Sequence, residues 1–137
     1  MTLELIADGA HVHPTVMRTL VAAAPGRVAL VSDATAAAGC GDGRYTLGGI
    51  LVDVVDGVPR MAGTPTLAGS GRTLGEMLPV LVAAGVALPV AVAAVTSVPA
   101  DAIGRGRDLG RLRVGSVADL VLWGPEMVAR RVIVAGS

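Results

Sequence analysis

Cysteine is nearly absent from this sequence, and long apolar runs are absent altogether. Cys40 is the only cysteine, so the chain cannot form an internal disulfide, which suits a reducing compartment. No apolar run reaches the roughly 18 residues that a membrane span needs. The first residues also lack the basic segment that begins a secretory leader. These absences predict a cytoplasmic protein.

Lysine is missing as well, and so is any excess of charge. The 11 basic residues are all arginine and balance 11 acidic residues, so no positive field is present that would attract nucleic acid. Hydrophobic residues make up 53% of the 137 residues and the mean hydropathy is +0.68, which is high for a small domain. A complete eight-stranded α/β barrel takes roughly 250 residues. We therefore expect at most part of a barrel, with apolar surface that a partner would cover.

The first third of the chain has the pattern of a strand, a helix and a second strand. Apolar runs at 3–7 and 28–31 flank a helical pattern that starts at a proline, and the second run is typical of a buried parallel strand. Such a crossover places the C-terminal ends of both strands at one edge of the sheet. Asp8, His11 and Asp33 should therefore converge there, at the edge where α/β proteins bind ligands.

The remaining residues alternate between β and α patterns. Pro79 should kink a helix in this part or mark its late start. The expected elements are a β-hairpin at about 45–62, a helix that follows a capping box at Thr73 and Glu76, a second helix at about 89–97, a charged loop at 105–108, and antiparallel strands at 117–123 and 128–134.

Five short motifs follow one another along the chain. They are Ile6–Pro14, Leu30–Thr35, Gly43–Gly49, Thr66–Ser70, and Gly110–Leu112 with Gly115–Val121. In this order they resemble the motifs of N-acetylglucosamine-6-phosphate deacetylases, which are metal-dependent amidohydrolases of amino-sugar metabolism. The last motif is shared by many amidohydrolases, whereas the first four together point to this deacetylase. The resemblance covers essentially the whole chain.

The resemblance implies an α/β fold class, namely the C-terminal fragment of a (β/α)8 TIM-type barrel. Residues 1–109 would form the C-terminal part of the barrel, including the β-hairpin, and residues 110–137 would form strands of a small β-sandwich. The family's metal ligands, a Glu and two His, would precede Met1. No residue of this chain is therefore expected to bind the divalent metal, zinc or similar, directly. The resemblance also implies a homodimer when complete, acting on a small sugar phosphate.

The resemblance assigns roles to two polar side chains and one short segment. Asp33 would be the catalytic carboxylate, taking a proton from the attacking water and passing it to the leaving amine. His11 would bind the substrate, because an imidazole can hydrogen-bond hydroxyl or carbonyl oxygens. The substrate would also lie against Leu67, Ala68, Gly69 and Ser70, whose small side chains let backbone approach a ligand.

Each of these residues also has a purely structural interpretation. Asp33 could cap the following segment, and residues 67–70 could be a turn before a helix. His13 completes a His-x-His spacing that occurs in metal sites, but a loop or N-cap role is the preferred interpretation. Cys40 has no visible partner and is expected to be a bystander thiol.

Two further residues are expected to be structural. Asp8 should shape the loop that carries His11, and Asp119 should brace the terminal β structure. Two other functions stay open at this point: a different amidohydrolase of the same superfamily, and a non-catalytic remnant or assembly component that needs a partner chain. Open strand edges and an uncovered apolar face would make the isolated chain oligomeric or poorly soluble.

Overall fold

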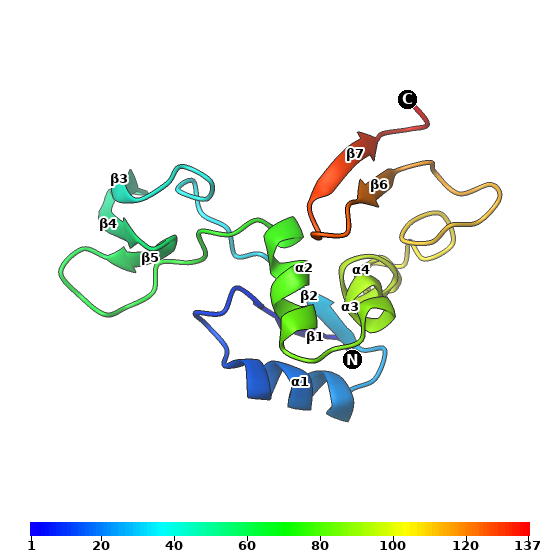
Figure 1. Ribbon diagram of the computed structural model, residues 1–137, viewed down its shortest axis with the longest axis horizontal. Helices are drawn as coiled ribbons and strands as arrows, with labels where there is room; N and C mark the ends of the chain where they lie inside the picture. The colour runs from blue at the N-terminus through cyan, green and yellow to red at the C-terminus, as the bar shows by residue number, and fades with distance from the viewer.

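A computed structural model describes all 137 residues, which form a central α/β body with two β extensions (Figure 1). None of its helices is long and apolar enough to cross a membrane. The elements are, in order, β1 (Leu3–Leu5), α1 (Pro14–Ala23), β2 (Val28–Leu30), β3 (Gly43–Leu47), β4 (Ile50–Val55), β5 (Val58–Met61), α2 (Leu74–Ala83), α3 (Leu88–Val95), α4 (Ser97–Ala102), β6 (Leu120–Trp123) and β7 (Ala129–Ile133).

The expected strand-helix-strand unit is confirmed. β1 and β2 pair in parallel, with Leu3 opposite Val28, and α1 forms the crossover between them. Proline begins α1 at a position where its missing N–H is not needed. His13 is the N-cap, and its ring Nδ1 accepts a hydrogen bond from the backbone N–H of Thr15 at 3.2 Å. The carboxyl ends of β1 and β2 therefore lie side by side, as the crossover requires.

The core of the central body lies between the two-stranded sheet and the helices. Side chains from β1, α1, β2, α2, α3 and the segments next to them form one cluster of 12 buried residues, including Leu5, Met17 and Leu81. Thr73 is the N-cap of α2, and the Glu76 carboxylate reaches back to accept its backbone N–H at 2.7 Å, as in a capping box. The proline at position 79 does not delay α2, which begins at Leu74 and continues through it. The capping box thus marks the start of this helix more reliably than its proline does.

The hairpin expected at about 45–62 is part of a three-stranded antiparallel sheet in the order β3-β4-β5. Sequence patterns predicted β4 and β5 but not the first strand, which begins at Gly43 in a glycine-rich stretch. Val52 and Val54 of β4 are buried with Ala37 in a cluster of their own. This sheet forms a lobe that projects from the central body at the left of Figure 1.

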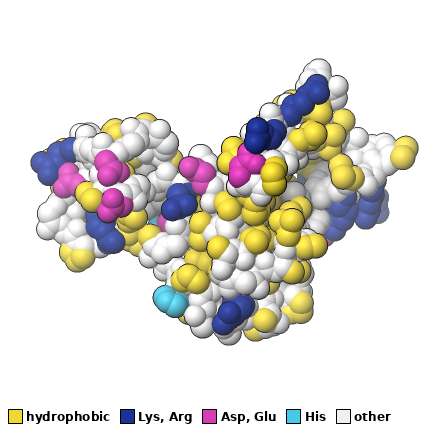
Figure 2. All heavy atoms as spheres, in the orientation of Figure 1, with side chains coloured by type: hydrophobic (Ala, Val, Ile, Leu, Met, Phe, Trp, Pro, Cys, Tyr) yellow, Lys and Arg dark blue, Asp and Glu magenta, His cyan; other side chains and the backbone are white.

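The chain ends in the antiparallel hairpin β6–β7, which confirms the β structure expected there. Asp119 contributes the predicted brace, because its carboxylate accepts the backbone N–H of Ala135 at 2.8 Å. Apolar side chains of the hairpin are left uncovered; Val121 is 48% exposed and Val132 60% exposed. Hydrophobic side chains are also extensive on the face of the central body shown in Figure 2. β1 and β2 are the chain's only parallel strands, so it does not close a barrel.

Candidate functional site

Two loops at the carboxyl ends of β1 and β2 bring the candidate residues together. Asp8 shapes the first loop: its Oδ1 accepts the backbone N–H of Ala10 at 2.9 Å and that of His11 at 3.0 Å. Its other oxygen, Oδ2, lies 2.8 Å from Nδ1 of the His11 ring. Gly9, with φ +86°, allows the tight turn between them. The expected role of Asp8 in shaping this loop is therefore confirmed.

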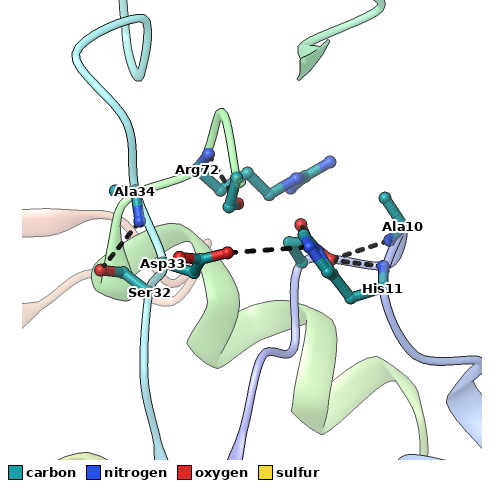
Figure 3. A network of polar contacts seen from close by, with 8 residues as sticks. Ala10, His11, Ser32, Asp33, Ala34 and Arg72 are labelled. Atoms are coloured by element: carbon teal, nitrogen blue, oxygen red, sulfur yellow. Dashed lines mark hydrogen bonds and ion pairs between the residues drawn. The ribbon is translucent and has the colours of Figure 1, made fainter. Parts of the chain in front are cut away.

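The second loop presents Asp33 to the first. The Oδ2 of Asp33 lies 3.8 Å from Nε2 of His11, and the two side chains point toward one another in Figure 3. Asp33 has φ +46°, a left-handed conformation that Asp and Asn adopt more readily than most residues. Its side chain is 54% exposed, against 19% for His11 and 5% for Asp8. The exposed carboxylate thus lies at the open end of the row Asp8–His11–Asp33.

The inner end of this row carries a negative charge. Burial raises the pKa of Asp8, but hydrogen bonds from the backbone of His11 and Ala10, from the His11 ring and from Ser70 outweigh it, and the pKa lies below its ordinary value of 3.8. Asp8 is therefore ionised at neutral pH and acts only as an acceptor.

Of the segment 67–70, only Gly69 and Ser70 lie next to Asp33. The backbone N–H of Ser70 donates to the Asp33 carbonyl at 2.8 Å, and the N–H of Thr35 donates to the Ser70 carbonyl at 3.1 Å. A Cβ on Gly69 would lie 2.8 Å from that same Asp33 carbonyl oxygen. The first half turns to the β3-β4-β5 lobe, where Ala68 donates to the Pro59 carbonyl at 3.0 Å and Leu67 forms a bridge with Arg60.

A small cavity of about 190 Å³ adjoins the site. Its lining consists of Asp8, Gly9, Ala10, Gly57, Val58 and Arg72. Arg72 takes part in none of the chain's ion pairs, and Figure 3 shows its side chain extending above His11 and Asp33 in that view. Sequence reasoning missed this residue, because a single arginine in a loop has no spacing that marks it as part of a site.

The chain's donor groups do not form a metal site by themselves. No group of three or more His, Cys, Asp or Glu side chains is placed to hold one. Nδ1 of His11 is engaged by Asp8, and Nδ1 of His13 caps α1, which confirms the preferred N-cap interpretation of His13. Cys40 is an exposed thiol whose Sγ lies 3.4 Å from the Ala36 carbonyl oxygen.

Sequence comparison identifies the class of protein. The Amidohydrolase family model matches residues 2–137, so the chain belongs to the amidohydrolase family. It is 34% identical over 134 residues to N-acetylglucosamine-6-phosphate deacetylase of Danio rerio, covering 97% of this chain but 33% of that relative. It is 37% identical over 136 residues to a putative N-acetylgalactosamine-6-phosphate deacetylase of Escherichia coli K12, covering 98% of this chain and 81% of that relative.

Solved structures agree with this assignment. A mutant N-acetyl-D-glucosamine-6-phosphate deacetylase from Mycobacterium smegmatis, in complex with N-acetyl-D-glucosamine-6-phosphate, superimposes with a TM-score of 0.91 at 38% identity. That match covers 99% of this chain and 37% of the other. The enzyme from Pasteurella multocida gives a TM-score of 0.93 at 29% identity. The chain thus spans about a third of the length of most of the deacetylases it matches, and its fold is that of a part of them.

Proposed function

We propose that this chain supplies the acid–base carboxylate and a substrate-binding histidine for deacetylation of N-acetylglucosamine 6-phosphate, which gives glucosamine 6-phosphate and acetate. The observation that carries the proposal is the meeting of Asp33 and His11 across the ends of two parallel strands, with 3.8 Å between Oδ2 and Nε2. Similarity to sugar-phosphate deacetylases over nearly the whole chain supports the choice of reaction.

Amide hydrolysis needs a group that first accepts and later donates a proton. The Asp33 carboxylate would take a proton from the attacking water while the water oxygen forms its bond to the acetyl carbon. When the carbon–nitrogen bond breaks, Asp33 would return that proton to the leaving nitrogen, so the carboxylate ends the cycle as it began. A half-exposed carboxylate on a backbone fixed by Ser70 suits both steps, because substrate can reach it while its position is held.

His11 and the segment 67–70 would hold the sugar beside Asp33. The Nε2 of His11 faces the same space as the carboxylate and would hydrogen-bond a substrate oxygen. Gly69 and Ser70 are packed on the Asp33 backbone and would bound the site. Leu67 and Ala68 would extend this boundary toward the β3-β4-β5 lobe.

The amidohydrolase family typically depends on metal, and the donor groups of this chain do not form such a site. A zinc or similar divalent ion would therefore be held by residues other than those of this chain. In this proposal residues 1–109 are the C-terminal part of a barrel, and residues 110–137 are strands of a small β-sandwich. The assembled enzyme would be a homodimer that acts in the cytoplasm.

A second candidate function is that of an assembly component without catalysis of its own. The specific observation in its favour is the uncovered apolar surface of β6–β7, which is of the kind that another polypeptide covers.

The test measures free amine released from N-acetylglucosamine 6-phosphate in the presence of zinc. The purified chain is assayed alone and together with the part of the M. smegmatis deacetylase that it does not match, for wild type and Asp33→Asn. Activity in either arm that falls by about 10²–10⁴-fold in the variant supports the acid–base role. Equal activity of the two forms would refute that role, and inactivity of wild type in both arms would favour the assembly component.

The same assay tests which of two sugar phosphates is the better substrate. The relatives include deacetylases of both N-acetylglucosamine 6-phosphate and N-acetylgalactosamine 6-phosphate, which differ in the configuration of one hydroxyl. We expect faster release from the glucosamine derivative. Faster release from the galactosamine derivative would reassign the substrate and leave the role of Asp33 intact.

A further inference from the structure

The two oxygens of the Asp8 carboxylate have different partners. Oδ1 accepts two backbone N–H groups of its own loop, from Ala10 and His11. Oδ2 is 2.8 Å from the His11 ring. The first pair of hydrogen bonds shapes the loop, as Asp readily does in turns. The contact with the ring is not needed for that turn and instead bears on which nitrogen of the imidazole carries the proton.

The direction of the ring hydrogen bond follows from the charge of its partner. An ionised carboxylate has no proton to donate, so Nδ1 of His11 must carry the proton and donate it to Oδ2. In a neutral imidazole the other nitrogen then has a free lone pair. That nitrogen, Nε2, is the one that faces Asp33.

We propose that Asp8 is a positioning residue that keeps the His11 proton on Nδ1 and thereby offers Nε2, beside Asp33, as a hydrogen-bond acceptor. The group that such an acceptor binds is a donor, and on N-acetylglucosamine 6-phosphate the donors are the sugar hydroxyls and the amide N–H. His11 therefore binds one of these donors rather than the acetyl carbonyl oxygen. This inference rests on the proposed function for the identity of the ligand, whereas the tautomer itself follows from the geometry of the chain.

The exposed fractions of the Asp8, His11 and Asp33 side chains are consistent with these roles. Asp8 is shielded from water, His11 is mostly shielded, and Asp33 is open to solvent. A shielded carboxylate holds an imidazole orientation better than an exposed one, because water competes less for the hydrogen bond. The carboxylates that face the ring are Asp8 at Nδ1 and Asp33 at Nε2, and the cavity next to Asp8 adds the cation Arg72.

The test is the tautomer of His11, read from the ¹⁵N chemical shifts of its ring at about pH 8, where an ordinary histidine is neutral. The chain has only two histidines, so His13→Asn leaves a single imidazole spectrum and keeps an N-cap side chain. We expect the proton of wild-type His11 on Nδ1. In Asp8→Asn the amide oxygen can keep the two backbone hydrogen bonds, which turns the NH₂ toward Nδ1 and moves the ring proton to Nε2.

The matched control is Asp42→Asn. Asp42 also accepts two backbone N–H groups, from Asp56 at 2.8 Å and Gly57 at 2.9 Å, but these are its only hydrogen-bond partners. The control should leave the His11 spectrum unchanged. A proton on Nε2 in the wild type would overturn the inference even if Asp8→Asn failed to fold, and so would an unchanged tautomer in a folded Asp8→Asn.

Deacetylase turnover in the reconstituted assay should fall roughly 10- to 100-fold in Asp8→Asn and stay near wild type in Asp42→Asn, as for other groups that orient a site histidine. The spectra need no substrate and no metal. Failure of the proposed function would therefore appear as a wild-type chain with the expected tautomer and no turnover. Failure of this inference would appear in the spectra themselves.

Discussion

Gly69, which packs on the backbone of Asp33, should tolerate a side chain poorly. It has φ +71°, and a Cβ built there would lie 2.5 Å from Cγ2 of Thr35 and 2.8 Å from the carbonyl oxygen of Asp33. A left-handed conformation costs an alanine about 1–2 kcal/mol, and overpacking adds about 1–3 kcal/mol. Gly69→Ala should therefore lower the free energy of unfolding by about 2–5 kcal/mol.

The chain supplies a matched control for this estimate. Gly63 has φ +74°, and a Cβ added there would meet no atom within 4 Å. Gly63→Ala thus carries the backbone strain without the collision and should cost about 1–2 kcal/mol. In thermal unfolding followed by circular dichroism, we expect Tm to fall by about 3–8 °C for the control and by about 6–20 °C for Gly69→Ala.

Equal losses in the two variants would refute the reasoning, since they would show that the segment moves away from Asp33 at no cost. Such an outcome would also mean that Gly69 does not hold the Asp33 backbone in place. A larger loss for Gly69→Ala would support the tight packing on which the proposed catalytic geometry depends.

Two further perturbations test other parts of the molecule. Hydrogen bonds from the backbone N–H of Thr73 and then from its hydroxyl lower the pKa of Glu76. The ionised carboxylate should therefore stabilise the protein at any pH above its unfolded pKa of about 4.3. This stabilisation should be lost as the pH falls through the lower pKa of the folded state. In urea unfolding, Glu76→Gln should lower the free energy of unfolding by about 0.5–1 kcal/mol at pH 7 and leave it unchanged near pH 2. A loss that is the same at both pH values would show that the charge is not involved. Val121→Thr with Val132→Thr should reduce self-association in analytical ultracentrifugation, because the two side chains pair on the exposed hairpin; Val16→Thr, 55% exposed on α1, is the control. A wild-type chain that sediments as a single monomer would contradict this last expectation.

Local patterns predicted most elements because each carries its own signal. A proline and a histidine cap fixed the start of α1, and the capping box fixed that of α2. The parallel crossover that this pattern predicts then places Asp8, His11 and Asp33 at one edge of the sheet, where the structure has them. Their chemical roles stay predictions, since geometry brings them together without showing what they do.

Other features could not be read from the sequence. β3 begins at the end of a glycine-rich stretch and has no apolar run of its own, so its pairing with β4 across the turn at 48–49 is what defines it. Pro79 lies inside α2, so the late start that was one of its two expected effects is wrong. Arg72 reaches the cavity through the path of its loop, which no periodicity encodes.

The left-handed backbone of Asp33 bears on how its importance can be measured. Alanine, glutamate and most other residues are disfavoured at φ +46°, so their introduction would disturb the turn as well as remove the carboxylate. An alanine scan would then overstate the chemical contribution of this position by adding a conformational penalty to it. Asparagine shares both the shape of aspartate and its tolerance of this conformation, and is therefore the replacement that isolates the charge.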